Sequence, residues 1–195
     1  MVRRGRPAAV LAAVLTICGC TGGAVDGVPS RGPVATANRP SDAGCTTAVR
    51  ITALRSRVAV TNAQQLGIGP DGTQTNAVLP SVAIVRASVS DPSVGGTLQS
   101  ALERRVGAQV ADAGMRTGDD PAVYTGTVRN TSPNHNRIFV AYRAVTVYTG
   151  NFRAACGQSV STGSFRTFGR PRTAAVPCTG PASVASRRLV ANYCR

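Results

Sequence analysis

Residues 137–148, RIFVAYRAVTVY, are the stretch of sequence that decides the fold. Branched and aromatic residues, which favour strands, dominate it. Successive side chains of an extended chain point to opposite sides. One side would carry Ile138, Val140 and Tyr142, and the other side would carry Arg137, Phe139 and Arg143. The stretch therefore predicts a strand, and the flanking segments are interpreted relative to it.

The segments on either side of this strand predict its partners. Residues 122–129 form a second extended run, and the intervening residues 130–136 (NTSPNHN) all favour turns. Two extended runs joined by such a turn predict an antiparallel hairpin. On the other side, Gly150 and Asn151 predict a bulge or turn. Residues 159–168 predict another strand, which a turn at 169–171 ends.

A helical period appears upstream. Apolar residues recur at helical spacing at Leu98, Ala101, Leu102, Val106, Val110 and Ala113. Asp91 and Pro92 fit the start of this helix, and Gly114 fits its end. We further expect a short helix over 182–193, strands within 47–61 and 81–90, and a loop over 62–80. Together these elements predict an α+β fold: an antiparallel sheet with one main helix and a short C-terminal helix on one face.

The N-terminus has the features of an export signal. Arg3, Arg4 and Arg6 precede an apolar run over residues 8–17 (AAVLAAVLTI). This run is shorter than the roughly twenty residues that span a bilayer, but it has the length of a signal-peptide core. Residues 17–20 (ICGC) follow it. This motif resembles the lipobox of bacterial lipoproteins, in which the cysteine receives diacylglycerol on sulfur and cleavage occurs just before it.

The resemblance covers residues 1–20 and implies that Cys20 is the lipidation site, on the extracytoplasmic face of the cell membrane. Other interpretations fit less well. Cys18 is a poorer acceptor, because Ile17 before it is not small. An Ala-x-Ala cleavage site at 35–37 lies far beyond the apolar run, and residues 5–7 lack the apolar residues of a twin-arginine signal. Export through general secretion is therefore favoured.

The lipobox divides the chain of 195 residues into three parts. Residues 1–19 are the expected signal peptide. Residues 20–44 are the lipidated cysteine and a Gly-, Pro- and Ala-rich tether, which we expect to be disordered because it has few large apolar residues. Residues 45–195 are the expected single α+β domain, which is of ordinary domain size at about 150 residues.

Four cysteines fall in the expected domain: Cys45, Cys156, Cys178 and Cys194. An exported domain meets conditions in which disulfides form, and four cysteines allow three pairings. Because Cys178 and Cys194 bracket the short C-terminal helix, we favour the pairs Cys178–Cys194 and Cys45–Cys156.

Motifs for catalysis or cofactors are weak. The chain contains no Lys, which excludes a phosphate-binding loop with its lysine and Schiff-base chemistry. Residues 67–72 spell GxGxxG, but Pro70 and Asp71 predict a turn with no helix after it, so we expect no dinucleotide cofactor. His135, the sole histidine, lies in the turn-rich segment; Glu103, the sole glutamate, lies on the main helix; and Asp119 and Asp120 lie in a loop. We expect no metal site and no enzyme. A hydrolase using His135 or these aspartates is a weaker alternative.

Positive charge is the remaining feature. The chain has 22 basic and 8 acidic residues, a net charge of +14, and residues 129–195 contain arginines but no Asp or Glu. We expect a basic sheet surface that binds anions, to which six arginines contribute: Arg137, Arg143, Arg153, Arg166, Arg170 and Arg172. Arginine pairs well with phosphate and carboxylate. A compositional bias of the genome is the competing explanation for the charge.

These observations predict a non-catalytic envelope lipoprotein that docks on an anionic wall polymer or phospholipid. An accessory subunit that binds a protein partner at the cell surface is the alternative. We expect no nucleic acid partner, because export separates the protein from it.

Overall fold

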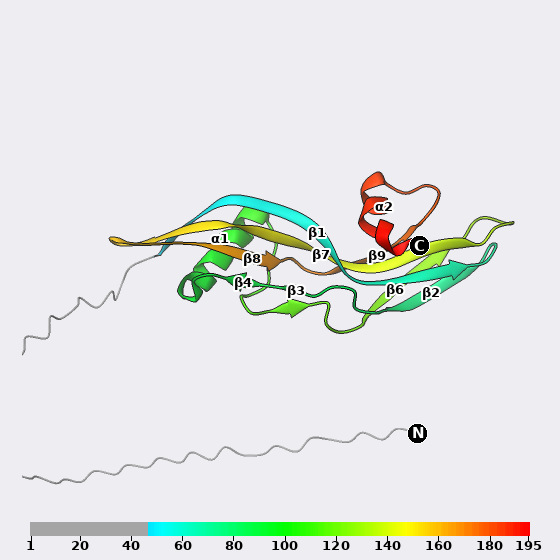
Figure 1. Cartoon of the computed structure of the whole chain (residues 1–195), viewed down its shortest axis with the longest axis horizontal. Coiled ribbons are helices and arrows are strands. Elements are labelled where there is room, and N and C mark those ends of the chain that lie inside the picture. Colours follow the sequence, from blue (N-terminus) through cyan, green and yellow to red (C-terminus); the bar gives the residue numbers. More distant parts are fainter. Residues whose placement is uncertain (1–46) are drawn as a thin grey trace, which may run out of the picture. The chain divides into compact units, whose positions relative to one another are not determined.

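One long strand, β7 (Arg137–Cys156), organises the described part of the chain, which is residues 47–195 of the computed structural model (Figure 1). Strand β1 (Ala48–Ile68) pairs antiparallel with it along one edge. The other edge is shared by β9 (Arg172–Pro177), which pairs with residues 139–144, and β8 (Ser159–Phe168), which pairs with residues 147–156. Strand β4 (Ser88–Val89) extends the sheet beyond β8. The predicted strands at 137–148 and 159–168 are thus confirmed.

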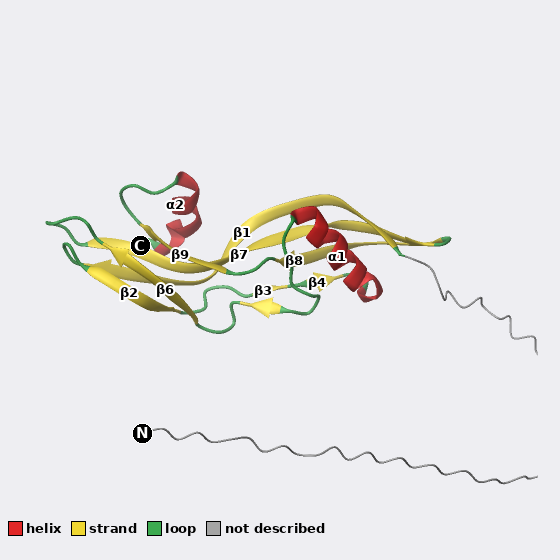
Figure 2. Cartoon of the chain, turned by 180° about the vertical axis from the view of Figure 1, so that it is seen from behind, coloured by secondary structure: helices red, strands yellow, loops and turns green. Residues whose placement is uncertain are grey.

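Smaller elements surround this five-stranded sheet (Figure 2). Strand β2 (Thr73–Leu79) pairs with β6 (Ala122–Arg129), and β3 (Val85–Arg86) pairs with β5 (Arg116–Thr117). The helices are η1 (Pro92–Val94), α1 (Gly95–Val106), α2 (Val184–Val190) and η2 (Ala191–Tyr193). Two separate helical regions and a mainly antiparallel sheet confirm the predicted α+β class.

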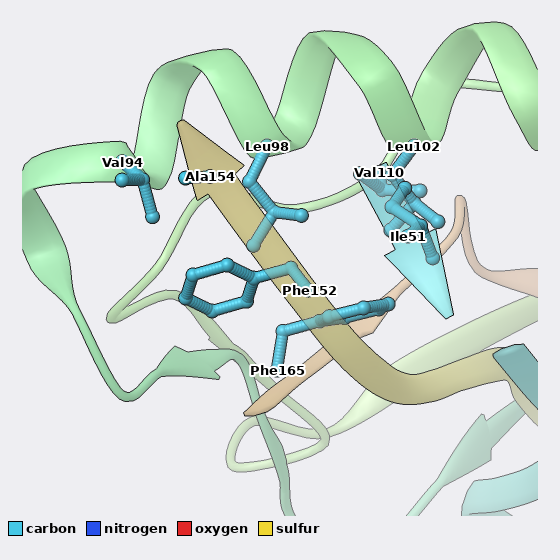
Figure 3. Packing of buried hydrophobic residues seen from close by; sticks show 8 residues of the cluster. All are labelled: Ile51, Val94, Leu98, Leu102, Val110, Phe152, Ala154 and Phe165. Carbon is cyan, nitrogen blue, oxygen red and sulfur yellow. The ribbon is translucent and has the colours of Figure 1, made fainter. Parts of the chain in front are cut away.

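The two faces of β7 pack against different layers. On the even-numbered side, Phe152 and Ala154 pack with Leu98 and Leu102 of α1 (Figure 3). The even-numbered residues Val140, Tyr142 and Ala144 pack with Val190 of α2. On the odd-numbered side, residues 139 and 141 pack against β2 and β6, and residues 145 and 147 pack against Val85 of β3. The register shifts between β1 and β7 add extra residues on β1 only, so side chains along β7 alternate between the two faces without interruption. Both helices therefore lie on one face of the sheet, as predicted.

The predicted hairpin between 122–129 and 137–148 is wrong. Strand β6 pairs with β2, and the predicted loop over 62–80 is instead the end of β1, a tight turn and β2. Ala122 and Val128 of β6 cluster with Leu79 of β2 and with Leu66 of β1. These contacts place β6 over the odd-numbered face of β7. The two strands meet through buried apolar side chains and are not hydrogen-bonded to each other along an edge.

Some predicted boundaries also need correction. Helix α1 ends at Val106, because Gly107 takes the left-handed conformation (φ 66°) and donates its N–H to the carbonyl of Glu103. Val110, expected on the helix, forms an isolated bridge with Gly169. The expected cap is confirmed for η1, where the carboxylate of Asp91 accepts from the backbone N–H of Ser93 at 3.1 Å. Of the expected strand 81–90, only the short β3 and β4 form, and β7 runs through Gly150 and Asn151 without interruption.

Asn130 links two loops that the sequence places far apart. Its side chain is fully buried, and its Nδ2 donates to the carbonyls of Ile68, Gly69 and His135 at 3.1, 2.8 and 2.7 Å. Its Oδ1 accepts from the N–H of Ser132 at 3.0 Å. The turn after β1 and the loop before β7 are therefore held together by one side chain.

We expect Asn130→Ala to lower the free energy of unfolding by about 2–4 kcal/mol. Each lost hydrogen bond contributes roughly 1 kcal/mol, and losing the donor to the buried carbonyl of Ile68 adds a desolvation cost. Urea denaturation measures this change. The control is Asn136→Ala, which changes the same residue type at an exposed position of the same loop. Asn76 is not used, because its positive φ of 57° would make an alanine there strained. Equal effects of the Asn130 and Asn136 variants would contradict the role assigned to Asn130.

A disulfide closes the C-terminal region. Cys178 and Cys194 are bonded with their Cα atoms 5.5 Å apart, which confirms the predicted pair. Closing a loop of about this length stabilises a fold by roughly 3 kcal/mol. Cys156 is also disulfide-bonded. Its predicted partner, Cys45, lies outside the described residues, as do Cys20, the expected signal peptide and the expected tether.

Candidate functional site

Arginines converge on one uncovered part of the main sheet, which we call the open basic face: Arg50 and Arg55 of β1, Arg153 of β7 and Arg166 of β8. It lies on the side of the sheet opposite α1, because Arg50 and Arg153 have the opposite parity to their neighbours Ile51 and Phe152, which pack under α1. Asn151 and Arg153 are exposed, so no described element covers this part of the sheet.

The register of the three strands arranges these arginines in rows. Arg50 is directly opposite Arg153, and Thr162 of β8 completes this row. Four residues back along β7, Thr149 has Arg55 on one side and Arg166 on the other. An uncharged row lies between the two, formed by Thr52, Asn151 and Ser164. Neighbouring strands are about 4.8 Å apart and successive rows about 6.6 Å apart, so the two charged rows lie about 13 Å apart. The four arginines therefore occupy a patch that one extended anionic segment can cover.

The charge of this face is uncompensated in the described part of the chain. Strands β1, β7 and β8 contain no Asp or Glu. The one ion pair among residues 47–195, Arg116–Asp119 at 2.7 Å, lies elsewhere. The Nε atom of Arg166 is buried and has no hydrogen-bond partner within these residues. The exposed side chains of Arg50, Arg55 and Arg153 therefore present guanidinium groups that remain available to an anion, and Arg166 adds a partly buried charge beside them.

The arginines singled out in the sequence do not form a single surface. Arg153 and Arg166 lie on the open basic face. Arg137 and Arg143 share the parity of Arg153, but buried residues such as Ala141 and Val145 separate them from it, and Arg137 lies roughly 50 Å away along the strand. Arg172 lies on the helix-bearing side of the sheet, since it pairs with Ala144. Arg170 follows β8 and donates to Oε1 of Gln109.

Sequence reasoning missed Arg50 and Arg55. In a regular strand two residues five apart point to opposite sides. The register of β1 against β7 shifts between Thr52 and Arg55, which returns Arg55 to the side of Arg50. Such a shift adds one residue to one strand, and Ala53 beside it has a positive φ of 51°. Nothing in the sequence marks this irregularity.

Comparisons with models of known protein families, with curated proteins and with solved structures find no match to this chain. The candidate site therefore depends on the geometry of the described residues alone.

The other sequence candidates occupy structural positions. The GxGxxG segment is the turn between β1 and β2, closed by the N–H of Gly72 donating to the carbonyl of Gly69 at 3.0 Å, as predicted. Glu103 accepts from the N–H of Val110 at 3.1 Å, and Asp119 pairs with Arg116. His135 is exposed. Within residues 47–195 no cluster of three or more His, Cys, Asp or Glu could hold a metal, and no helix there is long and apolar enough to cross a membrane.

The pKa of Asp91 is lowered by the hydroxyl groups of Ser161 and Ser93, which donate to its carboxylate at 2.6 Å each. These bonds join the start of η1 to β8. A carboxylate with a lowered pKa stabilises the fold above its unfolded pKa, and this contribution is lost as the pH falls through the folded value. Asp91 is thus engaged as a structural link between the helix and the sheet.

Proposed function

We propose that this protein is a bacterial lipoprotein, anchored through Cys20 on the extracytoplasmic face of the cell membrane, whose open basic face docks on an anionic wall polymer or on phospholipid headgroups. The lipobox motif supports the anchor. The arrangement of Arg50, Arg55, Arg153 and Arg166 supports the docking function.

The observation that carries this proposal is the direct opposition of Arg50 and Arg153 on neighbouring strands. Like charges at directly opposite positions destabilise a sheet, typically by about 0.2–1 kcal/mol. No acidic side chain in the described strands offsets this repulsion. A bound phosphate or carboxylate group would offset it, because the planar guanidinium group forms paired hydrogen bonds with either. An anionic partner therefore accounts for the opposed pair of arginines, which does not stabilise the isolated fold.

We expect the double variant Arg50→Gln/Arg153→Gln to bind its anionic partner more weakly and to unfold at a higher urea concentration. Binding is measured by co-sedimentation with isolated cell wall and, in a separate arm, with vesicles containing anionic phospholipid, each over a range of salt concentrations. The wild-type protein should lose affinity steeply with salt, because exposed charges are screened. The variant should show a shallower salt dependence.

The matched control is Arg187→Gln/Arg188→Gln, which removes the same charge from exposed positions on α2. This control should bind nearly as well as the wild-type protein. Equal losses of affinity in both double variants would mean that binding depends on the net charge of the protein and not on the open basic face. Binding that does not change with salt would contradict electrostatic docking. The arm that retains binding identifies the wall or the lipid as the source of the anion.

A further inference from the structure

A hollow lies on the helix-bearing side of the sheet, and we call it the α2 groove. It has a volume of about 460 Å³ and lies between α2, strand β9 and the centres of β1 and β7. Small-molecule sites typically have volumes of about 300–1,000 Å³ and are mainly apolar with a few polar groups. The α2 groove matches this description, and it lies on the other side of the sheet from the open basic face.

The floor of the groove is largely aliphatic. The strand register places Val58 opposite Thr146, and Ala144 between Val60 and Arg172. Tyr142 and Ala174, which are also opposite each other, continue this floor toward α2. Val58 is 52% exposed, although its neighbour Val60 is buried. The floor thus offers apolar surface to solvent beyond the region that α2 covers.

The wall of the groove is fixed in place by covalent and hydrogen bonds. Ala185, Ser186 and Leu189 of α2 line it. The Cys178–Cys194 disulfide closes the segment that contains α2. Nε2 of Gln65 donates to the carbonyls of Tyr193 and Arg195 at 2.6 and 2.7 Å, which ties the C-terminus to β1. These bonds restrain the segment that forms the wall, so binding would require little ordering of the chain.

The charge of the groove is positive at one end. Arg170 and Arg172 line it, and no acidic residue does. Arg170 is held by Gln109, but the side chain of Arg172 is exposed and makes no hydrogen bond or ion pair within residues 47–195. Burial raises the pKa of the Tyr142 hydroxyl, so this group stays neutral near neutral pH. Arg172 can therefore pair with an anion at the edge of an apolar floor.

We propose that the α2 groove binds a single aliphatic chain that ends in a carboxylate, with the carboxylate paired to Arg172 and the chain lying on Val58, Ala144 and Leu189. The aliphatic floor suits a flexible hydrocarbon chain, and Tyr142 is the one aromatic residue in the lining, so a planar aromatic ligand would find little to stack against. The positive end selects an anionic head and disfavours a cationic one. This inference does not depend on the docking function of the open basic face.

Isothermal titration calorimetry with dodecanoate, below the concentration at which it forms micelles, tests the proposal on the complete folded protein. We expect binding to the wild-type protein and at least tenfold weaker binding to Arg172→Gln, because a charge-assisted hydrogen bond is lost. Arg188→Gln, an exposed charge on α2 outside the groove, should bind dodecanoate as the wild-type protein does. Dodecanol and dodecyltrimethylammonium should bind at least tenfold more weakly than dodecanoate.

A second variant tests the apolar part of the site. Ala185 is exposed and lines the groove, so Ala185→Phe fills space without disturbing the core, and it should weaken dodecanoate binding without lowering the unfolding midpoint. The proposal is overturned if dodecanoate does not bind, if Arg172→Gln and Arg188→Gln bind alike, or if the cationic amphiphile binds as tightly as dodecanoate.

Discussion

Replacing Cys20 by serine is expected to remove the protein from the fully processed, membrane-bound pool and to yield unprocessed or soluble protein. A serine oxygen cannot accept the diacylglycerol group that the lipobox resemblance implies for the cysteine sulfur. Each buried methylene contributes about 0.8 kcal/mol to membrane binding, and stable anchoring requires two chains because a single one binds only reversibly. Lipidation of Cys20 is the source of anchoring that we propose.

Membrane fractionation together with incorporation of labelled fatty acid measures this effect. The matched control is Cys18→Ser, two residues earlier in the same motif, which should keep both the label and the membrane location. An unchanged membrane fraction for Cys20→Ser would overturn the proposed anchor. Loss of label in both variants would instead point to a general failure of export.

The sequence predicted the elements whose signals are local. Strand β8 has its predicted bounds, because its extended run ends at Gly169, where the chain turns. Helix α2 and η2 lie within the predicted helix over 182–193, and Ser183 caps α2 by accepting from the N–H of Ser186. The buried face of α1, carrying Leu98 and Leu102, also follows from its spacing. Each of these elements depends on residues close together in the chain.

Strand pairing depends on residues far apart, and there the sequence was less informative. The run 122–129 is followed by a turn-rich segment, so a hairpin was the simplest prediction. The burial of Asn130 in the same segment instead ties the loop to the end of β1, through bonds to Ile68 and Gly69. The end of β1 was predicted as a loop because residues 62–80 are polar. Buried polar residues such as Thr61 and Asn62 are compatible with a strand here, because hydrogen bonds within the fold satisfy their side chains.

The candidate site was predicted only in part for the same reason. Parity alone places Arg153 with Arg143 and Arg137, but parity does not reveal that buried residues divide this side of β7. The partners of Arg153 come from β1 and β8, and they are set by register and by the irregularity at Thr52–Arg55. A basic composition therefore predicted an anion-binding surface, and only the pairing of the strands indicated which arginines form it.

We expect Phe152→Ala to have the largest effect on stability, lowering the free energy of unfolding by about 3–5 kcal/mol. Phe152 is 2% exposed and lies at the centre of the cluster that joins α1 to the sheet (Figure 3). Gly163 on the neighbouring strand makes room for the ring of Phe152, since a Cβ at this position would lie within 2.9 Å of ring atoms. The neighbouring side chains are already packed in the same cluster, so they cannot fill the space that the ring leaves without moving.

Urea denaturation followed by circular dichroism measures the change, and Val160→Ala, at a position 50% exposed on β8, is the control, with an expected effect below about 0.5 kcal/mol. Phe152→Leu should fall between the two, because it retains much of the buried volume. Since α1 is attached to the sheet mainly through Leu98 and Leu102, the same substitution should also increase amide hydrogen exchange in α1 more than in α2. A loss of less than 1 kcal/mol, or equal exchange in both helices, would contradict the packing of α1 against β7, and with it the assignment of the open basic face to the opposite side of the same strands.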